Sequence, residues 1–375
     1  MQFPNNNQVA LVYERGVAEF DQIVAACARL LEVTYGKPFN PIERKPDTFA
    51  RLFGGDELMV TIEHVDGPPN PAVFAQPLGS AVTGLLCPDI RQRLARARAM
   101  ILINVSHGVL GDEIHDQFAA MFASIGMARE GANLPQFRRR LKMLANLSRL
   151  AAEDSHPSVV HWTQSNQLFP GERWDALAEP EAPSLIHLHP YLFGPREPAS
   201  GKPLLGIRTF GARHFIGHEL LLQPHEIDWS ENLEAMLAFM RVALAEGGYL
   251  IPDGDSFGPE DGSLSYRVHH RPAEEGDVPV IELVPLLHRG AGFVSPDYVP
   301  RERTIDDRMP PAAVMPADEE AKAELANEWR EKRKLAEGIG GRFEVRARGD
   351  APLPPPSPPR PGVLGGRAVF GRKKA

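Results

Sequence analysis

Short apolar runs and amphipathic helices follow one another in the same order in both halves of this chain. In the first half, an apolar run at 8–13 precedes apolar residues at helical spacing within 17–35. This change of period predicts a strand followed by a helix. Apolar runs at 49–53 and 57–65, joined by two glycines, predict a hairpin. A short helix and a buried strand at 100–105 complete the first series.

The second series follows two further predicted helices, whose apolar stripes lie within 114–125 and 137–150. Its own helix is predicted at 229–245, where apolar residues recur along one face. Glycine, proline and polar clusters separate the apolar runs and mark them as strands. The predicted strands of this half lie at 159–165, 185–192, 204–210, 218–223, 266–271 and 280–285.

Strand, helix, strand, strand, helix, strand is the order of the split βαβ, or ferredoxin-like, arrangement. We therefore expect an α+β protein with two ferredoxin-like (βαββαβ-order) halves and mainly antiparallel sheets. The first half covers residues 1–152 and the second covers residues 153–290. No residue-level repeat relates the two, so a single larger α+β domain with one long antiparallel sheet is the alternative.

Residues 291–375 differ in composition from the rest and are expected to form a tail. One helix is expected at about 318–337, because its acidic start and basic end suit the helix dipole. The proline-rich segment 352–361 predicts polyproline II structure or disorder. Its P-x-x-P spacing beside Arg360 fits polyproline recognition, so we expect a protein partner to bind through 291–375. A plain disordered linker with a basic end is the alternative.

Charge and composition exclude several classes of protein. The formal net charge is −8, although residues 338–375 carry eight Lys or Arg and only two Asp or Glu. The remaining chain is therefore acidic, which argues against nucleic-acid binding by the fold. Two cysteines cannot build a disulfide framework or a thiolate zinc site. No apolar run reaches about 18 residues and no secretory signal pattern opens the chain, so we expect a cytoplasmic protein without membrane contact.

Histidine is concentrated in the second half, where ten of the thirteen lie between residues 156 and 288. His187 and His189 alternate with apolar residues and should share one face of a strand. Imidazole and carboxylate groups on neighbouring strands can bind zinc or another divalent metal, although no H-E-x-x-H motif is present. The alternative is that these histidines form hydrogen bonds on a half-exposed sheet. The candidate polar site consists of His161, Trp162, His187, His189, His218 and Glu219.

The segment 254–258 matches the pattern G-x-S-x-G of serine hydrolases. A nucleophile elbow requires a helix directly after the serine. Here proline, aspartate and glycine follow, and then a further strand, so a turn between helix and strand is the better interpretation. We therefore assign no catalytic residue and no cofactor, apart from the divalent metal considered above.

Several short signatures carry a family resemblance over about residues 8–288. They are an apolar-Trp strand at 160–162, a glycine-containing strand at 206–211, Gly-x-Glu-apolar at 217–220 and a glycine turn at 254–256. Together they resemble a bacterial family known as domain of unknown function 4261. This resemblance implies a bacterial origin and transfers no catalytic residue, because that family has no established activity.

Three functional hypotheses follow from the sequence. The first is a non-enzymatic binding or scaffold module with an interaction tail, since no complete catalytic constellation is visible. The second is a metal-dependent enzyme that uses the histidine and glutamate cluster of the second half. The third is an immunity-type protein that neutralises a toxin, which rests on the acidic charge and the family resemblance alone.

Overall fold

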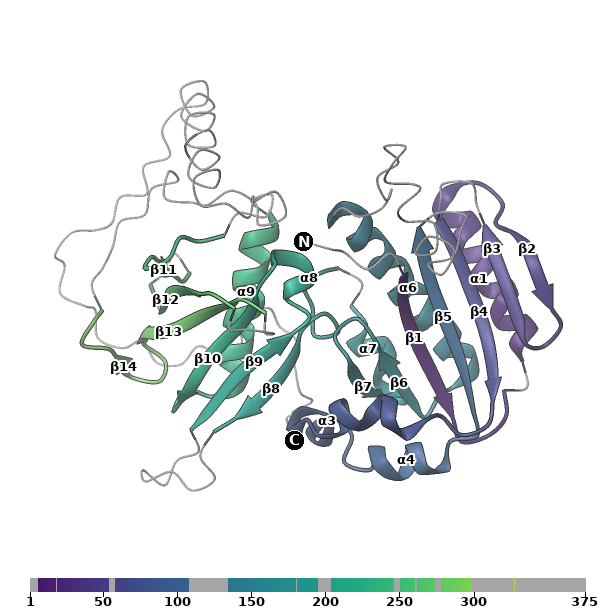
Figure 1. Ribbon diagram of the computed structural model, residues 1–375, viewed down its shortest axis with the longest axis horizontal. Helices are drawn as coiled ribbons and strands as arrows, with labels where there is room; N and C mark the ends of the chain where they lie inside the picture. The colour runs from purple at the N-terminus through teal and green to yellow at the C-terminus, as the bar shows by residue number, and fades with distance from the viewer. Residues whose placement is uncertain are drawn as a thin grey trace. The chain divides into compact units, whose positions relative to one another are not determined.

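In the computed structural model the chain forms two compact units (Figure 1). The first unit consists of residues 1–192 and 209–215, and the second of residues 193–208 and 216–375. The expected helix at 114–125 and the proline-rich segment lie outside the described residues, as does the expected helix at 318–337 apart from Asn327. The structure describes residues 6–17, 19–53, 58–107, 134–179, 181–194, 204–245, 250–259, 262–273, 278–298 and 327.

The first unit is built on a seven-stranded sheet with the strand order β2-β3-β4-β5-β1-β6-β7. Every neighbouring pair is antiparallel. The strands are β1 (Asn6–Tyr13), β2 (Asn40–Lys45), β3 (Phe49–Phe53), β4 (Leu58–Asp66), β5 (Ala99–His107), β6 (Val159–Trp162) and β7 (Gln167–Pro170).

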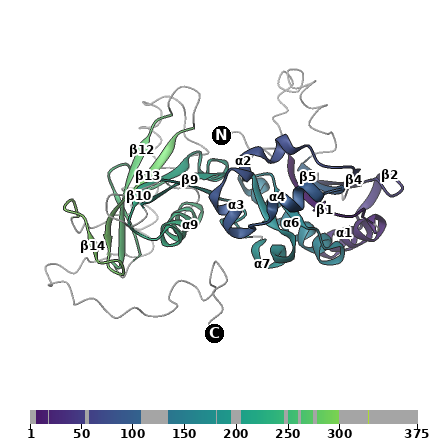
Figure 2. The same cartoon turned by 90° about the horizontal axis from the view of Figure 1, so that it is seen from below.

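Strand β1 lies inside this sheet because its apolar run is buried on both faces. Val9 and Val12 are both fully buried. Two long helices, α1 (Phe20–Tyr35) and α6 (Leu134–Ser155), contact each other, and α6 packs against β1 and β5 (Figure 2). The apolar stripe of α1 explains its place, since Ile23, Cys27 and Leu31 are fully buried.

Short helices between β4 and β5 close an apolar cluster around Val12. Phe74, Cys87 and Ile90 pack there with Val159 of β6. The side chains come from consecutive short elements, because prolines and glycines interrupt this stretch of the chain. The elements are the 3-10 helix η1 (Pro71–Phe74) and the helices α2 (Ala75–Leu78), α3 (Ala81–Leu86) and α4 (Ile90–Arg96).

The second unit contains a sheet with the strand order β11-β12-β13-β10-β9-β8, and β14 pairs with β13. Strands β10 and β13 are parallel, whereas the other pairings with a defined register are antiparallel. The division between the units falls within β8 and β9. The strands are β8 (His189–Phe193), β9 (Leu205–Phe210), β10 (Glu219–His225), β11 (Ser256–Phe257), β12 (Leu264–Arg271), β13 (Val280–His288) and β14 (Phe293–Val294).

Helix α9 (Trp229–Ala245) packs against the sheet of the second unit through aromatic and polar contacts. The rings of Phe239 and Phe257 are 5.3 Å apart between centroids and nearly perpendicular. The Tyr266 hydroxyl donates a hydrogen bond of 3.0 Å to the side-chain oxygen of the fully buried Asn232. This buried polar pair orients the helix on the sheet, since a lost partner would leave a buried polar group unsatisfied.

The expected α+β class is confirmed, and the sheets are mainly antiparallel. The ferredoxin-like order of the halves is not confirmed, because β1 lies between β5 and β6 and is antiparallel to both. For the same reason the first unit continues beyond residue 152, where the second half was expected to begin. No described helix is both long enough and apolar enough to cross a membrane.

Candidate functional site

The six candidate residues from the sequence are divided between the two units. His161, Trp162, His187 and His189 belong to the first unit. His218 and Glu219 belong to the second unit.

Three of the first unit's histidines contact a single turn, residues 163–166, which joins β6 and β7. Gln164 is the centre of this arrangement. Its side-chain nitrogen lies 3.4 Å from the carbonyl oxygen of His187, 3.3 Å from that of Gly211 and 3.2 Å from Nδ1 of His214. Its side-chain oxygen accepts a hydrogen bond of 3.4 Å from the Trp162 indole. The turn thereby attaches residues 209–215 to the first unit.

His161 supports the other end of this turn. Its Nε2 lies 2.9 Å from the side-chain oxygen of Asn166, and its ring packs edge-on against Phe74. Asn166 has a positive φ of 51°, which is tolerated by asparagine better than by most residues. Burial lowers the pKa of His161, and the hydrogen bond to Asn166 opposes that effect.

His187 is fully buried, and its ring is held from both sides. Nδ1 accepts a hydrogen bond of 3.2 Å from the Ser184 backbone N–H, which leaves the proton on Nε2. The rings of Trp162 and Phe215 lie nearly perpendicular to the imidazole, at centroid distances of 6.1 and 5.6 Å. Burial lowers the pKa of His187 to about 3, with a smaller contribution from Arg138, so the ring is neutral at pH 7.

His189 begins β8 and is 2% exposed. Neither ring nitrogen has a hydrogen-bond partner among the described residues. Burial lowers its pKa to about 4, and the backbone of Ser165 and Asn166, which approaches the ring without a well-formed hydrogen bond, opposes this effect. A buried neutral imidazole with two unpaired nitrogens lowers the stability of the fold.

The second unit holds the remaining two candidates at the start of β10. Nδ1 of His218 lies 3.2 Å from the carbonyl oxygen of Ile216, and its ring centroid is 5.7 Å from that of His270. Glu219 is 3% exposed and is paired in register with Val280 of β13. Within the described ranges, no three His, Cys, Asp or Glu side chains are grouped so that they could hold a metal ion.

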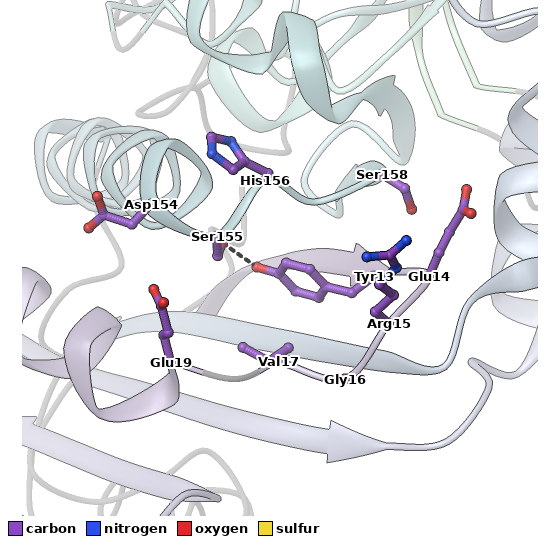
Figure 3. A pocket seen from close by; sticks show the side chains of 10 residues that line it. All are labelled: Tyr13, Glu14, Arg15, Gly16, Val17, Glu19, Asp154, Ser155, His156 and Ser158. Carbon is purple, nitrogen blue, oxygen red and sulfur yellow. Dashed lines mark hydrogen bonds between the residues drawn. The ribbon is translucent and has the colours of Figure 1, made fainter.

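A pocket of about 440 Å³ lies elsewhere in the first unit, where β1 ends and α6 approaches the start of α1 (Figure 3). Residues on three segments form it: the end of β1 with the loop after it, the end of α6, and the residues that precede β6. The lining residues are Tyr13, Glu14, Arg15, Gly16, Val17, Glu19, Asp154, Ser155, His156 and Ser158.

The Tyr13 side chain forms the middle of the pocket and is fixed in place. Its hydroxyl lies 2.7 Å from the Ser155 hydroxyl, which itself donates to the Ala151 carbonyl oxygen. Tyr13 therefore donates to Ser155. Burial raises the pKa of Tyr13, and the hydrogen bond to Ser155 opposes this effect. The phenol is neutral at pH 7, and because Tyr13 is 5% exposed it forms part of the pocket wall rather than a nucleophile.

Four charged side chains line this pocket, and none forms an ion pair with another described residue. They are Glu14, Arg15, Glu19 and Asp154. Three carboxyl groups and one guanidinium are thus available to charged groups of a ligand. Sequence reasoning did not select these residues. The available signal was the charged pair Glu14-Arg15 between a buried strand and an amphipathic helix.

No protein-family model matches the chain, and neither a curated protein nor a solved structure does. The functional conclusion therefore depends on the geometry of the pocket.

Proposed function

We propose that this protein is a non-enzymatic binding module that takes a small charged ligand in the pocket of its first unit. The supporting observation is that four charged side chains line one pocket without ion pairs in the described part of the chain. A volume of about 440 Å³ lies within the usual range for small-molecule sites. The histidines favour a structural role instead, since those of the first unit support a turn and the walls around it.

Ligand-observed saturation-transfer NMR with the full chain tests this proposal. Small organic cations, anions and zwitterions would be screened at low and high salt, because screening weakens exposed charge pairs. We expect at least one class to bind, and binding to weaken at high salt. The double variant Glu19→Gln/Asp154→Asn should lose binding of a cation or a zwitterion, and Arg15→Gln should lose binding of an anion. Binding that is unchanged in the matching variant, or no binding by any class, would contradict the proposal.

The interaction tail is a second part of the proposal and depends on sequence alone. The P-x-x-P spacing beside Arg360 and the basic residues after it support recognition by a protein partner. Co-purification with the full chain and with a chain that lacks residues 291–375 tests this. The same partners in both preparations would remove the tail from the proposal.

Two finer assignments also remain proposals. The ferredoxin-like comparison is supported by the strand-helix-strand-strand order at the start of the first unit. The resemblance to domain of unknown function 4261 is supported by the short signatures between residues 160 and 256. An experimental structure of a member of that family would test both, because a different strand order in its sheets would refute the relationship.

A further inference from the structure

The pocket of the first unit has two ends of different charge character. Figure 3 shows Glu19 and Asp154 at one end, Arg15 at the other, and the Tyr13 ring between them. Glu14 lies at the Arg15 end in this view but forms no ion pair with it. A cationic group is therefore favoured at the first end, and an anionic group can pair with the guanidinium at the second.

Asp154 occupies a position that does not favour a carboxylate. It lies in the last turn of α6, a 22-residue helix, where the helix dipole repels negative charge. No basic residue in that turn offsets the repulsion. Its charge also raises the pKa of the buried Cys27 thiol, after the larger effect of burial. Glu153 in the same turn experiences the same repulsion, but only Asp154 lines the pocket, where a cationic group of a ligand would offset it.

His156 and Glu19 are two further pocket residues whose side chains do not stabilise the helix ends where they lie. His156 ends α6 with a positive φ of 50°, in a place that glycine usually takes, and its N–H donates to the Ala152 carbonyl oxygen. Glu19 stands at the N-cap of α1, yet its carboxylate makes no capping hydrogen bond. Neither side chain caps the helix end at which it stands, and both residues belong to the lining of the pocket.

We propose that the ligand is a zwitterion whose ammonium and carboxylate groups are held apart by a short methylene chain. The ammonium lies at Glu19 and Asp154, the carboxylate at Arg15, and the chain spans the pocket between these two ends. This inference rests on the proposed function and specifies the ligand class of the same site. Because both ends of the ligand bind, a molecule with one charged group should bind at least about tenfold more weakly, which corresponds to the loss of one charge pair.

Isothermal titration of the full chain with probes of matched length tests this. The ω-amino acids β-alanine, 4-aminobutyrate and 6-aminohexanoate set the distance between charges. Butylamine, butyrate, 1,4-diaminobutane and succinate each supply one kind of charge. We expect one of the ω-amino acids to bind more tightly than every single-sign probe. Equal or tighter binding of a single-sign probe would overturn the zwitterion, although it would leave the binding pocket in place.

Variants assign each end of the ligand. Arg15→Gln should reduce the affinity for the ω-amino acid to that of butylamine, while the affinity for butylamine stays the same. Asp154→Asn should weaken both. The matched control is Glu153→Gln, which removes a carboxylate from the same turn at an exposed position outside the pocket. If Glu153→Gln weakened binding as much as Asp154→Asn, the effect would come from the overall negative charge of this surface. That result would overturn the proposed contact between Asp154 and the ligand.

The two proposals can fail separately. Suppose that no ω-amino acid binds, but that the NMR screen finds another ligand whose binding is abolished in the Glu19→Gln/Asp154→Asn variant. The assignment of a zwitterionic ligand is then wrong, and the proposed binding function stands. If neither experiment detects binding, both proposals are wrong.

Discussion

The Gln164 side-chain nitrogen lies 3.3 Å from the carbonyl oxygen of Gly211, 47 residues later in the chain. This contact attaches residues 209–215 to the β6–β7 turn of the first unit. Gly211 is required for it, since its φ is +107° and a Cβ there would lie 2.5 Å from the carbonyl oxygen of His187. The contact between these two segments therefore depends on the side-chain amide of Gln164 and on the absence of a Cβ at Gly211.

Replacement of Gln164 by leucine should destabilise the first unit by about 1–3 kcal/mol. The change keeps the volume but leaves the Trp162 indole and two backbone carbonyl groups without their partner. Urea unfolding followed by tryptophan fluorescence measures it. Gln22→Leu, at an exposed position on α1, is the control and should change the midpoint little. A stable Gln164→Leu variant would show that the turn is held by packing alone.

Acid should destabilise the first unit through its buried histidines. Burial lowers the pKa of His187 to about 3 and those of His189 and His214 to about 4. In the unfolded chain the pKa of each group is about 6.5. Below that pH the unfolded state therefore binds protons that the folded state does not. Their contribution to stability is therefore complete above about pH 6.5 and is lost as the pH falls toward 3–4.

The pH dependence can be assigned with one variant. His189→Leu removes a buried imidazole with two unpaired nitrogens, so it should flatten the slope of unfolding free energy between pH 6.5 and 4.5. At pH 7 its stability should be equal or higher. Gln22→Leu, at an exposed position on α1, removes no titratable group and should leave the slope unchanged. If the unfolding free energy of both variants depended on pH in the same way, His189 would not be a source of the acid sensitivity.

Neutralising Asp154 should stabilise the protein while it weakens binding. Asp154→Asn removes a negative charge from the end of α6 and should raise the unfolding free energy by about 0.3–1 kcal/mol. Asp21→Asn is a control of opposite sign, because Asp21 lies in the first turn of α1 and pairs with Arg44 at 2.7 Å. Thermal unfolding measures both variants. Unfolding midpoints that shift in the same direction would contradict this prediction.

Arg93 joins α4 to the segments around β6 and should tolerate little change. Its guanidinium donates two hydrogen bonds to Glu172, of 2.6 and 2.8 Å, and one of 3.1 Å to the Ser158 carbonyl oxygen. Arg93→Lys keeps the charge but cannot form this fork, so it should cost on the order of 1 kcal/mol after solvent screening. Arg96→Lys on the exposed side of α4 is the control. Equal unfolding midpoints would show that only the charge at position 93 matters.

Much of the secondary structure could be predicted from apolar spacing alone. The strand at 8–13, the hairpin strands at 49–53 and 57–65 and the helix at 229–245 correspond to β1, β3, β4 and α9. Local patterns decide these elements, since each needs only one buried face. Two expected strands begin late or end early. The strand expected at 159–165 ends at Trp162, where the turn at 163–166 begins. The strand expected at 185–192 begins only at His189, because Nδ1 of His187 accepts a hydrogen bond from the Ser184 N–H in a turn.

The sequence by itself determined the α+β class and the elements whose apolar residues recur with a clear period. Only the tertiary structure decided that β6 pairs with β1, because strand pairing depends on contacts across some 150 residues that no local pattern encodes. The same holds for the sites. The histidines are close in sequence but are divided between two units, whereas the charges of the pocket come from residues 14–19 and 154, which meet only after α6 packs against β1.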